Sequence, residues 1–260
     1  MAPLIFDGAR LKAERAQRHI EAIQALLGDL VAESDLFATR TEVDPESGRN
    51  IFAAEIKEIP ALKFVPVIIG DAVHNLHCVL DHMHWAITDA VGTPGRYTRF
   101  PFKKSRKELV DALNGGEIRK AGSAVIDYIV DGIRPYAEGG DDLLVGLHEL
   151  DIIDKHRLTI PFITSAEVES RFRVDEGEVF TLWPPHKWTV TSTGEQRPIS
   201  AAADAKITGD HRTTFEVVFR EDSPFKREPV VPILSALLLK LDGIVMDMER
   251  ICAEKGIVHP

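Results

Sequence analysis

Six polar, reactive or aromatic side chains lie on one side of the apolar segment at residues 64–91. At about 100° per residue in an α-helix, that side carries Asp71, His74, Cys78, Asp81, His82 and Trp85. It holds no Lys, Glu, Arg or Gln, which are typical of a solvated helix face, and cysteine and tryptophan are usually largely buried. We therefore expect this side to be buried and each Asp and His to be paired or to bind a ligand, because burying them alone costs several kcal/mol.

A second helix, expected over residues 143–156, can supply partners. Its inward leucine stripe continues into Asp154 and Arg157. An Asp and an Arg on the core side of a helix end need counter-charges or hydrogen bonds. The simplest arrangement is one ionisable cluster formed by Asp71, His74, Asp81, His82, Asp154, His156 and Arg157.

Three interpretations of this cluster stay open. In the first, it is a satisfied polar network that fixes helix packing or a dimer contact without chemistry. In the second, a histidine beside a carboxylate acts as acid and base near neutral pH, and Arg157 stabilises an oxyanion or a phosphate. The enzyme is then a hydrolase whose catalytic residues are His74, Asp81, His82, Asp154, His156 and Arg157, with the aspartates as orienters.

The third interpretation is a site for a divalent transition metal. Spacings of three and four residues place histidine and carboxylate ligands on one side of a helix. The candidate ligands are Asp71, His74, His77, Asp81 and His82. The sequence has no Glu-x-x-His pair, and His148-Glu149 is not followed by the second histidine of a zinc-protease motif.

Several short motifs resemble those of a family of uncharacterised bacterial and phage proteins, over about residues 60–161. These motifs are Gly70-Asp71-Ala72-Val73-His74-Asn75-Leu76, Leu80-Asp81-His82, Arg134-Pro135-Tyr136 and Asp154-Lys155-His156-Arg157. The family pattern His-Asn-Leu-Arg-Ser-x-Leu-Asp-His is similar to the catalytic motif of HEPN-type helical ribonucleases, an Arg followed after four residues by a His. Here His77 stands at the Arg position and His82 at the His position, so Arg157 would have to hold the phosphate. The resemblance implies a phosphodiester or RNA-like substrate.

Composition and charge restrict the class of protein. With 260 residues, 44% of them hydrophobic and 28% charged, the chain is typical of one soluble globular domain. Its net charge of −10 disfavours broad nucleic-acid binding, because an acidic surface repels a phosphate backbone. Two cysteines without a Cys-x-x-Cys pair, and no signal peptide, predict a cytoplasmic setting. Asp71, His74 and Asp81 interrupt the most apolar segment, so we expect no membrane span, and we expect a homo-oligomer.

The expected fold is α+β: a mainly helical bundle with a small antiparallel β-sheet insertion. Apolar periodicity predicts helices over residues 9–31, 64–91, 105–113, 117–133, 143–156 and 230–251. A turn cluster at 44–48 predicts a β-hairpin within 39–59, and alternating residues predict strands between 166 and 221. The single domain, 1–260, then consists of a bundle over about 9–158 and 229–254 and a β insertion over about 166–221. His84 and Thr88, at the margin of the polar side, are expected to be exposed.

Overall fold

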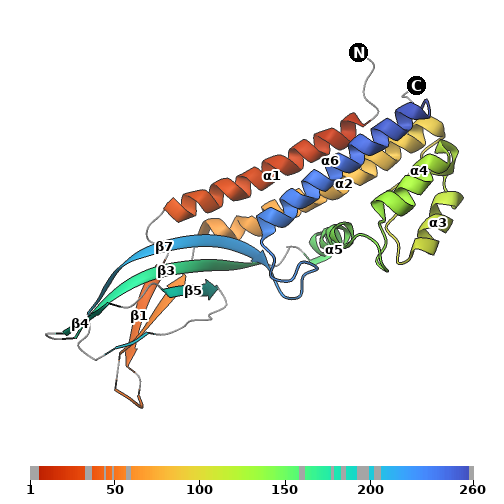
Figure 1. The fold of residues 1–260 in the computed structure, drawn as a ribbon. Coiled ribbons are helices and arrows are strands. Elements are labelled where there is room, and N and C mark those ends of the chain that lie inside the picture. The colour runs from red at the N-terminus through yellow and green to blue at the C-terminus, as the bar shows by residue number, and fades with distance from the viewer. Residues whose placement is uncertain are drawn as a thin grey trace.

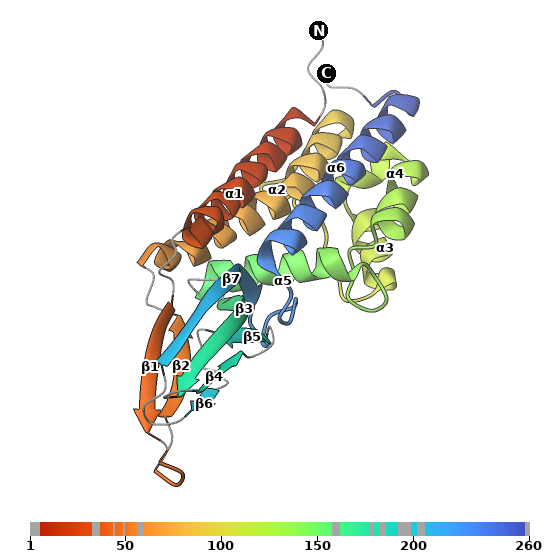
Figure 2. The same cartoon turned by 60° about the vertical axis from the view of Figure 1, so that its left-hand side comes forward.

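Three long helices form the body of the protein. The computed structural model describes residues 6–32, 37–43, 45–48, 50–56, 60–157, 162–176, 179–182, 186–191, 199–201 and 206–257. Helices α1 (Asp7–Ala32), α2 (Val65–Val91) and α6 (Val230–Glu254) lie side by side (Figure 1). Helix α5 (Asp142–Arg157) lies across them (Figure 2). The helical bundle expected from the sequence is confirmed.

The segment between α2 and α5 is broken into short helical pieces. Helix α3 (Arg106–Gly115) is followed by a 3₁₀ turn (Glu117–Ala121), by α4 (Ser123–Asp127) and by a π-helical turn (Tyr128–Ile133). The prediction of one continuous helix over 117–133 is therefore wrong. Gly122 interrupts it with φ of 91°, a left-handed backbone conformation that glycine adopts without steric cost.

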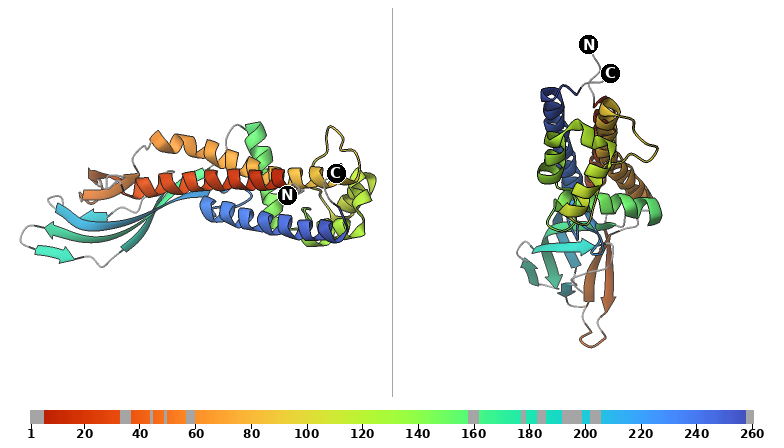
Figure 3. Two further views of the ribbon diagram at one scale, coloured as in Figure 1. Left: turned by 90° about the horizontal axis from the view of Figure 1, so that it is seen from above. Right: turned by 90° about the vertical axis from the view of Figure 1, so that its right-hand side faces the viewer.

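Strands extend from one end of the bundle, where α1 ends and α6 begins (Figures 1 and 3). They are β1 (Phe37–Val43), β2 (Asn50–Ile56), β3 (Phe162–Glu176), β4 (Val179–Leu182), β5 (His186–Thr191), β6 (Ile199–Ala201) and β7 (Lys206–Phe219). One sheet has the order β1-β2-β6, and in the other β3 pairs with β4, β5 and β7; all these pairs are antiparallel. The end of β7 enters the helical core, where Phe219 is fully buried. The long β3·β7 ribbon thus links the strands to the bundle.

Helix α2 occupies the centre of the bundle and contacts α1, α5 and α6. Its apolar side is fully buried and consists of Ile69, Ala72, Leu76, Val79, Met83 and Ile87. Among the described residues, one helix, at Leu62–Val91, is long and apolar enough to cross a membrane, but half of that apolar stretch is buried inside the bundle. A buried core helix has the same composition, so this is only a weak indication of a membrane span.

The packing of α5 can be tested with two helical glycines. A Cβ atom at Gly146 of α5 would lie 2.5 Å from Cζ of Phe225, whereas a Cβ at Gly243 of α6 would meet no atom within 4 Å. We predict that Gly146→Ala lowers the free energy of unfolding by about 1–3 kcal/mol, because the ring must move. The matched control Gly243→Ala should raise it by roughly 0.5–1 kcal/mol, since alanine favours the helix. Urea unfolding followed by circular dichroism measures both, and equal effects would contradict the contact.

Candidate functional site

The candidate site lies where α5 crosses the N-terminal half of α2. The two helices approach closely at Gly70, because a Cβ there would lie 2.1 Å from Oδ1 of Asp154. One and two turns further along α2, histidines meet ionisable residues of α5. The contact between these two helices therefore carries a layer of polar side chains next to the apolar core.

Asp151 of α5 is the buried carboxylate in this layer. Its side chain is only 3% exposed, and its Oδ1 lies 3.1 Å from Nδ1 of His74. The ammonium group of Lys155, one turn along the same helix, pairs with Oδ2. Nδ1 of His77 lies 3.7 Å from Oδ2. Both oxygens therefore have partners, as a buried carboxylate requires.

His74 is the open member of the site. Its side chain is 44% exposed although one edge of its ring reaches the buried Asp151. A carboxylate can only accept hydrogen bonds, so we assign the proton to Nδ1, which leaves Nε2 of the neutral ring as an acceptor. Nε2 lies 3.5 Å from Sγ of Cys78. His74 thus presents a proton-accepting nitrogen at the protein surface, beside a thiol.

His77 and His148 form a second, more deeply buried pair. Nε2 of His77 lies 3.1 Å from Nδ1 of His148, and Nδ1 of His77 faces the carboxylates of Asp81 and Asp151 at 3.5 and 3.7 Å. We assign the proton of His77 to Nδ1, which faces both carboxylates without a hydrogen bond, so that Nε2 of His77 accepts from Nδ1 of His148. Burial, and then the charge of His77, lowers the pKa of His148. The ring of Phe102 covers His148, with centroids 4.3 Å apart and planes nearly parallel.

Asp81 connects the histidine pair to the chain segment that follows α2. Its Oδ1 accepts a hydrogen bond of 2.8 Å from the backbone N–H of Phe100. Burial alone would raise the pKa of Asp81, but the interactions with His77 and with the Phe100 N–H lower it below its ordinary value. Asp81 is therefore a carboxylate that fixes the position of the His77 ring.

Two of the predicted residues lie on the other side of α2, toward α1. His82 is exposed and its ring rests on Gly8, where a Cβ would lie 2.7 Å from His82 Nδ1. Partial burial, and then the charge of Lys12, lowers the pKa of His82. Asp71 is exposed, and Trp85 is 45% exposed. The prediction that the whole polar side is buried is therefore wrong, because α1 and α5 cover different parts of it.

Of the three predicted residues at the end of α5, the structure describes the side chain of Asp154 alone. Asp154 is partly buried against Gly70, one turn of α2 before His74. Burial, and then the charges of Asp151 and Asp71, raises the pKa of Asp154. His156 and Arg157 belong to the last turn of α5, but their side chains lie outside the part that the structure describes. The single cluster of seven ionisable residues is therefore corrected: His74 and Asp81 belong to the site, and Asp71 and His82 face away from it.

The structure does not bring the five predicted metal ligands together. From Asp71 to His82 the helix rises by about 16 Å at 1.5 Å per residue, which is too far for one ion to contact both ends. Within the described part of the chain, no three His, Cys, Asp or Glu side chains are placed to hold one metal ion.

Sequence reasoning missed three residues of the site. His148, Asp151 and Lys155 are spaced by three and four residues and follow the buried Leu144 and Leu147 along one side of α5. That helical spacing could have identified these three residues as one side of α5 from the sequence alone. The prediction instead extended the leucine stripe to Asp154, three residues beyond the carboxylate that is buried.

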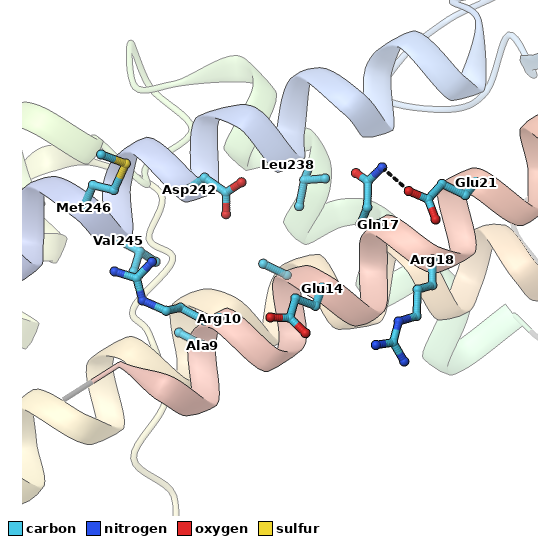
Figure 4. Close-up of a pocket in the computed structure, with 11 residues that line it drawn as sticks. Ala9, Arg10, Glu14, Gln17, Arg18, Glu21, Leu238, Asp242, Val245 and Met246 are labelled. Atoms are coloured by element: carbon cyan, nitrogen blue, oxygen red, sulfur yellow. Dashed lines mark hydrogen bonds between the residues drawn. The ribbon is translucent and has the colours of Figure 1, made fainter. Parts of the chain in front are cut away.

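A groove of about 550 Å³ lies elsewhere, between α1 and α6 (Figure 4). Its walls carry opposite charges, including Arg10 and Glu14 of α1 and Asp242 of α6. Burial raises the pKa of Asp242, and Arg10 acts in the opposite direction. None of the predicted site residues lines this groove.

No family model, curated protein or solved structure matches this chain. A functional assignment for this chain therefore depends on the geometry of the site. The two positions aligned with the HEPN-type motif, His77 and His82, lie about 140° apart around α2 at 100° per residue. His77 contacts α5 and His82 contacts α1, so their side chains do not act on one point.

His84 and Thr88 are buried, with exposed fractions of 7% and 2%, so the prediction of exposure is wrong. The Thr88 hydroxyl donates a 2.9 Å hydrogen bond to the backbone carbonyl of His84. The His84 ring packs edge-on against Phe100, with centroids 6.0 Å apart. Burial lowers the pKa of His84 from 6.5 to about 4, and Asp81 opposes this shift.

The buried His84 predicts a loss of stability in acid. Between pH 6.5 and about 4 the unfolded chain binds a proton on His84 that the folded protein does not bind. The stability contributed by the neutral ring is therefore present above pH 6.5 and is lost as pH falls through this window, by up to about 3 kcal/mol. In an NMR titration, His84 should have a midpoint near 4, and His84→Leu should reduce the acid loss of stability. A midpoint at 6.5 would contradict the burial of a neutral ring.

Proposed function

We propose that the protein is a hydrolase in which His74 is the general acid–base group and Asp151 orients it. The observation that carries this proposal is the 3.1 Å contact between His74 Nδ1 and Asp151 Oδ1. It joins an imidazole that is 44% exposed to a carboxylate that is 3% exposed. A carboxylate in this place fixes the tautomer and the direction of the ring, so the free Nε2 can take a proton from water or from a substrate hydroxyl.

The substrate class we propose is a small phosphodiester or a short RNA. Two lysines make contacts next to His74 and its partner: Lys155 pairs with Asp151, and Lys12 of α1 donates to Oδ1 of Asn75, the residue after His74, at 3.3 Å. Both charges also act on the thiol of Cys78 beside His74. Two positive charges near His74 favour a small anionic substrate such as a phosphodiester, whereas the net charge of −10 disfavours a long polyanion.

The proposal does not rest on the two positions that resemble the HEPN-type motif, because His77 and His82 contact different helices. His74, rather than His82, supplies the acid–base nitrogen in our proposal, because His74 has the buried carboxylate partner. The cytoplasmic setting and the homo-oligomer stay predictions.

Two substitutions test the proposal. We predict that His74→Ala lowers kcat on bis(p-nitrophenyl) phosphate, or on a short RNA, by roughly 100-fold or more, which is typical for loss of a general acid–base group. Asp151→Asn should also lower kcat, because an amide can present its N–H to Nδ1 and stabilise the wrong tautomer. His19→Ala on α1 is the matched control and should hydrolyse at the wild-type rate. Circular dichroism checks that each variant is folded, and a folded His74→Ala protein with full activity would contradict the proposal.

A further inference from the structure

A thiol completes a line of three groups at the candidate site. Sγ of Cys78 lies 3.5 Å from Nε2 of His74, and Nδ1 of His74 lies 3.1 Å from Oδ1 of Asp151. We propose that Cys78 is a nucleophile that accepts an acyl group from a small ester or thioester, with His74 as its base and Asp151 as the orienting carboxylate. A nucleophile, a base and a group that orients the base are the components of acyl-transfer sites on unrelated folds.

The backbone holds the thiol and the imidazole in place. His74 and Cys78 are one turn apart on α2, so their side chains lie on the same side of the helix. Asp151 comes from α5 and fixes the ring from behind. Cys78 is partly exposed, whereas Cys252 of α6 is completely buried in the core. Cys78 is therefore the more accessible of the two thiols.

The thiol needs this base. Burial, the largest influence, raises the pKa of Cys78, and the positive charges of Lys12 and Lys155 only partly oppose it. At neutral pH the group is a thiol rather than a thiolate, so its proton must leave during the attack. The acceptor nitrogen of His74 points at Sγ from the distance of a weak hydrogen bond.

The reaction balances with water as the only co-reactant. The S–H proton moves to Nε2 of His74 while sulfur forms a bond to the carbonyl carbon, and the carbon–oxygen or carbon–sulfur bond to the leaving group breaks. The proton on Nε2 passes to the departing alkoxide or thiolate, which leaves as an alcohol or a thiol. Water then attacks the carbonyl carbon of the Cys78 thioester and gives a proton to Nε2 of His74. The carbon–sulfur bond breaks, and His74 returns this proton to sulfur, which releases a carboxylic acid and the free thiol.

Acyl substrates fit the charges around the thiol. The attack places a negative charge on the carbonyl oxygen, and Lys12 and Lys155 are the cations whose charges act on this thiol. The inference rests on the proposed role of His74 as a base, but it does not depend on a phosphodiester substrate.

Acylation by p-nitrophenyl acetate tests the inference on the full chain. After a short incubation, peptide mass spectrometry should find one acetyl group on Cys78 and none on Cys252. Cys78→Ala should remove the acetylated cysteine and the initial burst of p-nitrophenol. His74→Ala should slow acetylation of Cys78 by roughly 100-fold, whereas His19→Ala, on α1, should not change it.

Several results would overturn the inference. Acetylation of both cysteines at one rate would show simple access to reagent, and a folded His74→Ala protein acetylated at the wild-type rate would show that no base is used. If His74→Ala does not fold, His74→Asn, which keeps a polar group facing Asp151, is measured in its place. Acetylation of Cys78 without phosphodiester hydrolysis would overturn the proposed substrate alone. Phosphodiester hydrolysis without acetylation of Cys78 would overturn this inference alone.

Discussion

The carboxylate of Asp151, buried between α2 and α5, is the interaction on which the arrangement of the site depends. Removing such a charge from water costs several kcal/mol unless partners surround it. Its partners come from both helices: His74 from α2 and Lys155 from its own helix. The same contact therefore holds α5 across α2 and sets which nitrogen of His74 carries the proton. The burial of Asp151 therefore constrains both the packing of the two helices and the protonation of His74.

The inner histidine pair extends this constraint toward the core. Nδ1 of His77 faces the carboxylates of Asp81 and Asp151, and Nε2 of His77 faces His148. The ring of Phe102 stacks on His148. The hydrogen bond between the two rings requires one nitrogen with a proton and one without. Protonating both rings would break that bond and bring two cations together. The pair can thus support the position of Asp151, while His74 is more open to a reactant than His77.

The polar side of α2 could be predicted from sequence because helical periodicity is a local property. The choice of partners could not be predicted, because it depends on where α5 crosses. Asp151 and Asp154 are three residues apart: Asp151 is buried against His74, whereas Asp154 lies against Gly70 and is only partly buried. His74 and His82 likewise occupy one side of α2 on a helical projection. They are separated in the structure because His74 contacts α5 and His82 contacts α1.

The burial of His84 and the break at Gly122 have different causes. Neither follows from apolar spacing: the first depends on the ring of Phe100, sixteen residues further along the chain, and the second on a single positive φ. Side-chain packing and a local backbone conformation therefore decided these two features, whereas the apolar periodicity of α1, α2 and α6 predicted the bundle.

The tautomer of His74 tests the central claim most directly. Nitrogen-15 NMR of histidine-labelled protein distinguishes a ring protonated at Nδ1 from one protonated at Nε2. The account predicts that neutral His74 carries its proton on Nδ1 in the wild-type protein and loses this preference in Asp151→Asn. A His74 ring protonated at Nε2, or one unaffected by that substitution, would contradict the claim that Asp151 orients the base.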